Sequence, residues 1–100
     1  MTKAEAKKLC IKKWEWIVEN SEVMINYARM YKELPELEEL LNNCGYCELY
    51  LFSKNCRKCP LVKIHGQKEN CNRDNSTYMK WARTPSLQNA QKMLDLIKQT

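Results

Sequence analysis

Apolar residues recur every three or four positions over the first third of the chain, which is the period of one face of an α-helix. Thr2 can cap this helix, and Glu5, three residues later, completes a capping box. The period continues without a break and predicts one long helix over residues 2–33. Its main apolar stripe consists of Cys10, Trp14, Ile17, Ser21, Met24, Ala28 and Tyr31.

A second apolar stripe runs along the same predicted helix and includes Trp16, Val23, Tyr27 and Met30. More than half of the circumference is therefore apolar, whereas a surface helix normally shows a narrower stripe. We expect the second stripe to be covered by the C-terminal helix or to bind a partner, and we assign these four residues as partner-binding because tryptophan is enriched at such surfaces. Its partly heptad-like spacing also allows a homodimer of first helices.

The rest of the chain predicts shorter elements. Pro35 suits the first turn of a short second helix, and the stop signals that follow it include Gly45. Residues 77–83 predict one or two helical turns, and residues 85–99 predict a C-terminal helix with one apolar face. The expected fold is mainly α, a single small domain over residues 1–100, with an irregular metal-binding loop region at residues 44–76.

Length and composition support a small folded protein. A chain of 100 residues allows one domain, close to the size at which a metal or a partner subunit is often needed. No stretch is apolar enough to cross a membrane, and the N-terminal residues lack the apolar run of a secretory signal. We therefore expect a cytoplasmic protein, whose six cysteines are better explained by metal ligation than by disulfides.

Five of the six cysteines follow the spacing C-x2-C-x8-C-x2-C-x11-C. Each C-x2-C pair can aim two sulfurs at one centre, so two pairs can surround a tetrahedral zinc ion. The simplest ligand set is Cys44, Cys47, Cys56 and Cys59. A second set replaces Cys56 by Cys71, and spacing alone does not separate the two sets. Four thiolates leave no open position for water, so the zinc is expected to be structural and the protein not to be an enzyme.

Other chemistry is less well supported by the sequence. An iron–sulfur cluster is the rival to zinc, although the compact ferredoxin spacings are absent. Cys10 lies on the main apolar stripe and is expected to be a buried small hydrophobe. His65, the single histidine, has lysines on both sides and is expected in an exposed loop.

The formal charge of +5 is concentrated in residues 44–83, which carry eight basic and three acidic residues interleaved with aromatic ones. A basic, aromatic zinc knuckle can bind nucleic acid through phosphate contacts and base stacking. The alternative is that the lysines are solvated while Tyr78 and Trp81 pack in the core. We favour core packing for these aromatics, and for Trp14 as well.

The runs CGYCELY and CRKCPL, followed by Cys71 and then Tyr78 and Trp81, resemble small uncharacterised proteins encoded by phages and prophages. The likeness covers about the middle 40 residues and implies a phage context, with the host cytoplasm as location, and a cysteine-bound metal. Together these features predict a non-enzymatic, zinc-stabilised protein that binds a protein partner and modulates or inhibits a host protein. Nucleic-acid binding is the alternative.

Overall fold

The computed structural model describes residues 1–20, 27–40, 44–51, 58–60 and 77–100. Every regular element in these ranges is helical, which confirms the mainly α fold. In chain order the elements are α1 (Lys3–Glu19), α2 (Tyr27–Glu33), the 3₁₀-helix η1 (Pro35–Leu37), the π-helix η3 (Cys47–Leu51), α4 (Thr77–Arg83) and α5 (Leu87–Lys98).

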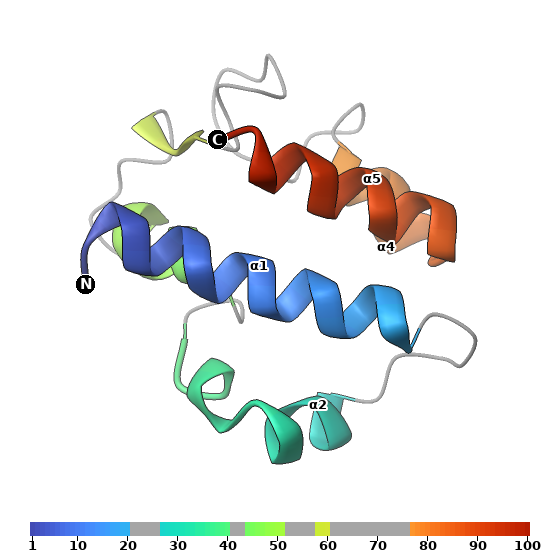
Figure 1. Ribbon diagram of the computed structural model, residues 1–100, viewed down its shortest axis with the longest axis horizontal. Helices are drawn as coiled ribbons and strands as arrows, with labels where there is room; N and C mark the ends of the chain where they lie inside the picture. Colours follow the sequence, from blue (N-terminus) through green and yellow to red (C-terminus); the bar gives the residue numbers. More distant parts are fainter. Residues whose placement is uncertain (21–26, 41–43, 52–57, 61–76) are drawn as a thin grey trace.

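Helices α1 and α5 lie side by side in opposite directions and form the centre of the molecule (Figure 1). Both helices begin at a side-chain cap. The Thr2 hydroxyl accepts a hydrogen bond from the Glu5 amide, and the Ser86 hydroxyl accepts one from the Asn89 amide. The Lys7 ammonium donates to the carbonyl of Lys98, which places a positive charge at the C-terminal end of α5. The buried residues of the two facing stripes include Ala6, Cys10, Trp14 and Ile17 of α1 and Ala90, Met93, Leu94 and Ile97 of α5.

An aromatic cluster joins α4 to the middle of α1. The rings of Trp14 and Trp81 meet edge to face with centroids 4.8 Å apart, and both side chains are buried. Tyr78, one turn before Trp81, contacts the same Trp14 ring at 6.4 Å. The prediction that Trp14 and Trp81 are core residues is confirmed, and Tyr78 packs beside them.

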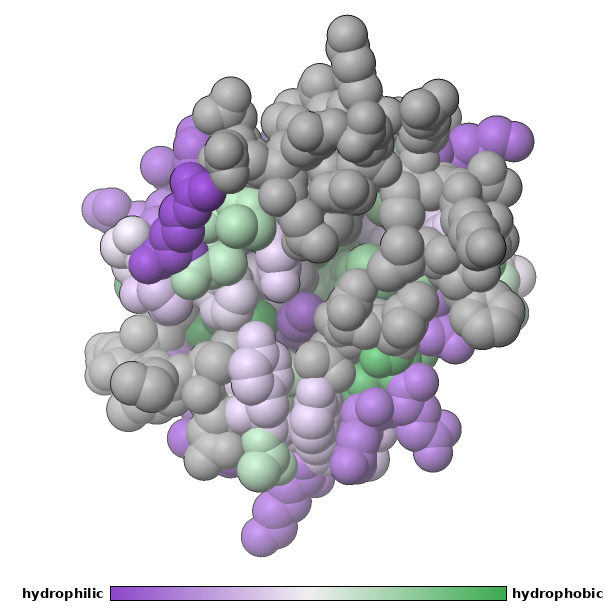
Figure 2. Space-filling view, turned by 180° about the vertical axis from the view of Figure 1, so that it is seen from behind, coloured by the Kyte–Doolittle hydropathy of each residue, from purple (hydrophilic) through white to green (hydrophobic). Residues whose placement is uncertain are grey.

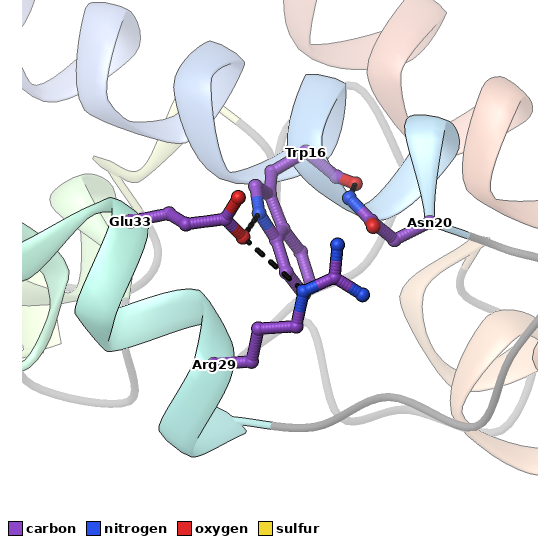
Figure 3. A network of polar contacts seen from close by, with 4 residues as sticks. All are labelled: Trp16, Asn20, Arg29 and Glu33. Carbon is purple, nitrogen blue, oxygen red and sulfur yellow. Dashed lines mark hydrogen bonds and ion pairs between the residues drawn. The ribbon is translucent and has the colours of Figure 1, made fainter.

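The single helix predicted over residues 2–33 is wrong in its extent. Helix α1 ends at Glu19, where the side-chain amide of Asn20 donates to the carbonyl of Trp16 at 2.8 Å. Helix α2 folds back beside α1. The Trp16 indole N–H donates to the Glu33 carboxylate of α2 at 2.6 Å (Figure 3). Along one straight helix these two residues would lie about 25 Å apart.

Folding back of α2 changes the surface expected to meet a partner. Trp16 is buried beneath Glu33 and Arg29, whose guanidinium lies 5.8 Å from the indole ring. Met30 is fully buried, so neither Trp16 nor Met30 is exposed as the sequence interpretation required. Tyr27 is 41% exposed, and Val23 lies outside the described residues. Helix α2, and not the C-terminal helix, covers the second stripe at Trp16.

We expect Glu33→Ala to lower the free energy of unfolding by about 1 kcal/mol, which is below the usual range for a bond to a charged group because Glu33 is half exposed. The variant leaves the Trp16 N–H without its acceptor and removes the ion pair with Arg29. Urea denaturation followed by tryptophan fluorescence measures the change. The matched control is Glu15→Ala, on an exposed position of α1, which should stay within about 0.5 kcal/mol of the parent protein. Equal effects of the two substitutions would contradict the docking of α2 through Trp16.

Candidate metal centre

The segment that follows Cys44 lies directly against the backbone of α1. A Cβ atom added to Gly45 would lie 2.3 Å from the carbonyl oxygen of Ala6, so only glycine fits at this position. Ala6 is fully buried and has the smallest side chain that keeps a Cβ. The small residues Gly45 and Ala6 therefore allow residues 44–51 to lie directly on the N-terminal half of α1.

This approach brings Cys10 to the first predicted ligand pair. Cys10 lies one turn after Ala6 on the same face of α1, and its Sγ is 3.7 Å from the Sγ of Cys44. Cys47 follows on the same helical turn, where the Glu48 amide donates to the Cys44 carbonyl, and its thiol also hydrogen-bonds Cys44. The thiol of Cys44 therefore contacts two others, that of Cys10 from α1 and that of Cys47 from its own segment.

Backbone donors also point at these sulfurs. The Cys47 amide donates to the Cys44 sulfur, and the Tyr46 amide donates to the Cys10 sulfur. Backbone N–H bonds of this kind stabilise a negatively charged sulfur. The turn therefore presents the hydrogen-bonding environment that a thiolate requires.

The pKa values of the two thiols in contact, Cys10 and Cys44, are shifted in opposite directions. Hydrogen bonds from the thiols of Cys10 and Cys47 hold the pKa of Cys44 well below its usual value, and the Lys13 ammonium acts in the same direction. The pKa of Cys10 is raised, first by its hydrogen bond to Cys44 and then by burial. The contact between the two sulfurs therefore lowers the pKa of Cys44 and raises that of Cys10.

Lys13 is a buried charged residue, with 5% of its surface exposed. Its Nζ lies 5.5 Å from the centroid of the Trp14 ring. Among the described residues it makes no ion pair with a carboxylate, although buried lysines are almost always paired. Its charge lowers the pKa of both Cys10 and Cys44.

Tyr46 connects the cysteine turn to the end of α5. Its side chain is buried, and its hydroxyl lies 2.7 Å from the Oγ1 of Thr100. Because the Thr100 hydroxyl donates to the Ile97 carbonyl, the Tyr46 hydroxyl is the donor in this contact. Burial raises the pKa of Tyr46, and charge on Cys10 and Cys59 adds to the effect. Cys59 is buried in the same core cluster as Tyr46.

The structure describes three of the predicted ligands, Cys44, Cys47 and Cys59, while Cys56, Cys71 and His65 lie outside the described residues. As placed, the described side chains include no group of three or more metal-ligating residues arranged around one ion. The choice between the two predicted ligand sets, and between zinc and an iron–sulfur cluster, stays a prediction.

Cys10 is the functional candidate that sequence reasoning missed. The prediction that Cys10 is buried is confirmed, but its sulfur contacts another thiol instead of only hydrocarbon. A signal was present in the sequence, because Cys10 and Ala6 share a helical face and Gly45 adjoins Cys44.

No protein-family model matches the chain, and no curated protein or solved structure shows significant similarity to it. The resemblance to phage-encoded proteins stays a prediction. Within the described ranges, none of the helices combines the length and apolarity needed to span a membrane.

We expect Gly45→Ala to destabilise the protein by about 1–3 kcal/mol, as overpacking does, because the new methyl group would overlap the backbone of Ala6. The sign of the change in the free energy of unfolding is informative. Gly45 is helical, and replacing a helical glycine by alanine normally stabilises a protein by up to about 1 kcal/mol. Thermal unfolding followed by circular dichroism measures the effect. Adding Ala6→Gly should not restore stability, because the overlap is with backbone atoms; a stable single variant would refute the close approach.

Proposed function

We propose that this is a zinc-stabilised helical protein that acts by binding a macromolecular partner and not by catalysis. The zinc ion is held by Cys44 and Cys47 together with further cysteines from the second pair or Cys71. The observation that carries the proposal is the contact of cysteine thiols around Cys44, with backbone N–H groups aimed at the sulfurs. Soft thiolate ligands suit zinc and not the hard cations.

The role of the ion is structural in this proposal. The candidate centre lies where three parts of the fold meet: Gly45 contacts α1, Tyr46 bonds to Thr100 after α5, and Cys44 bonds to its neighbours in the turn. An ion bound here would tie these parts together. A site filled by four thiolates has no position left for a substrate or an activated water, which argues against a hydrolytic role.

The proposed partner is a protein, which in the phage context that the resemblance implies would be a host protein that this chain modulates or inhibits. Of the four residues assigned to this role, Tyr27 is the described one that is exposed. Its ring lies 6.3 Å from that of Tyr31, which is half-buried against the core, so the exposed Tyr27 ring is supported by a second aromatic side chain on α2. Tyrosine is enriched among the residues that dominate binding energy at protein interfaces. A homodimer through this surface is the simplest version of the same proposal.

Nucleic-acid binding is the second candidate. Its support is the exposure of three basic residues in the region where the charge is concentrated, namely Lys58, Lys80 and Arg83. Figure 2 shows strongly hydrophilic side chains around the rim of one face, with less polar residues between them. Hydrophilic residues distributed in this way favour solubility, whereas a phosphate backbone binds to basic residues clustered on one face.

Removal of the metal should destabilise the whole fold. The purified protein is expected to contain one zinc ion per chain, and a chelator should lower its melting temperature. A metal contribution of only about 3 kcal/mol corresponds to a decrease of roughly 12–24 °C for a domain of this size. Calorimetry with elemental analysis provides the measurement, and Cys47→Ser should reproduce the chelated state. A chain that is free of zinc and iron and insensitive to chelation would refute the proposed centre.

Partner binding is tested by affinity capture from host lysate at low and high salt, after nuclease treatment. A protein partner should be retained at high salt, and Tyr27→Ala should reduce its recovery about tenfold or more, the effect of losing a strong interface residue. Leu87→Ala is the matched control, because Leu87 is an exposed apolar residue on α5, away from α2. Binding that requires nucleic acid and weakens steeply with salt would favour the second candidate.

A further inference from the structure

We propose that Cys10, from the first helix, is itself a zinc ligand, and that the site consists of Cys10, Cys44, Cys47 and Cys59. This inference rests on the proposed zinc centre and changes its composition. It takes one ligand from outside the two C-x2-C pairs and leaves Cys56 and Cys71 out of the coordination sphere. The ion would then join α1 covalently to the turn at residues 44–51.

The separation of the two sulfurs supports this assignment. Zinc–sulfur bonds of about 2.3 Å in a tetrahedron place neighbouring sulfurs about 3.8 Å apart. The Sγ atoms of Cys10 and Cys44 are 3.7 Å apart, so this pair already has the length of a tetrahedral edge. A disulfide would require about 2.05 Å. The two residues are 34 positions apart in sequence, so their spacing does not follow from local chain geometry.

Cys10 receives a backbone hydrogen bond from the turn, as Cys44 does. The Tyr46 amide is directed at the Cys10 sulfur in the same way that the Cys47 amide is directed at Cys44. A cysteine that served only as a small hydrophobe would need neither an aimed backbone donor nor a second sulfur beside it. Both features are expected of a sulfur that carries negative charge when metal is bound.

Lys13 gives an independent indication that the region is anionic. Its ammonium group is buried one turn after Cys10 without a carboxylate partner among the residues that the structure describes. A zinc ion with four thiolates carries a net charge of minus two, which would compensate this buried cation. The proposed centre would therefore explain why the buried Lys13 ammonium needs no carboxylate among the described residues.

Cys59 is assigned as the fourth ligand because it is buried in the same core cluster as Cys10 and Tyr46. The described sulfurs are not yet arranged around one ion, so zinc binding requires the side chains of Cys47 and Cys59 to turn toward the Cys10–Cys44 edge. Rotation about one side-chain bond carries a sulfur between staggered positions without moving the backbone.

The decisive test uses the double variant Cys56→Ser/Cys71→Ser, which retains only the four cysteines of the proposed site. Zinc affinity is measured by competition with a chelator, and the number of bound thiolates by the sulfur-to-cobalt absorption after cobalt(II) substitution. The double variant should bind zinc within about tenfold of the parent protein, less than the effect of losing a ligand, and show an unchanged four-thiolate spectrum. Loss of a thiolate in this variant overturns the proposed set of four ligands.

The complementary variant is Cys10→Ser, which should weaken zinc binding by roughly 100-fold or more and reduce the cobalt absorption by about a quarter. It should lower the melting temperature of the zinc-loaded protein much more than that of the chelated protein. A packing role alone would lower both equally, as expected for the control Ile97→Val in the buried face of α5. Unchanged affinity in Cys10→Ser overturns this inference and leaves the zinc centre standing, whereas a parent protein that binds no metal overturns both.

Discussion

The contact between the backbone at Gly45 and the backbone of α1 at Ala6 determines where the cysteine turn lies. A side chain at either position larger than those present would push the turn away from the helix. With the turn held there, Cys44 reaches Cys10, and Tyr46 enters the core and bonds to Thr100 beyond α5. The candidate metal centre is therefore a consequence of close backbone packing before any ion is considered.

Several features could be predicted from sequence because they depend on local chemistry. The Thr2 cap needs only the Glu5 amide three residues away, and the Ser86 cap needs only that of Asn89. The apolar face of α5 and the burial of Trp14 and Trp81 follow from helical periodicity and residue size. Each of these predictions involves residues within one or two turns of each other.

The reversal after α1 could not be predicted in the same way. Apolar residues continue in helical register through residue 33 because α2 also needs a buried face, which it packs back toward α1. Periodicity is therefore the same for one long helix and for two helices folded together. Asn20 was the local signal, since its amide caps the carbonyl of Trp16. The contact of Cys10 with Cys44 was hidden for a related reason, because it joins segments 34 positions apart, and the small residues Ala6 and Gly45 indicate it only once the two segments are known to pack together.

The pairing of α1 with α5 has a consequence for how the chain folds. The bond from Lys7 to Lys98 joins residues 91 positions apart, and the connection between the facing ends of the two antiparallel helices still runs from Glu19 to Leu87, so α1 and α5 meet only when a large loop closes. Small helical proteins usually fold quickly because their contacts are local, and large loops slow this step through their closure entropy. Pairing of α1 with α5 therefore carries a large loop-closure cost. An ion bound between α1 and the cysteine turn would divide this loop into two smaller ones and reduce that cost.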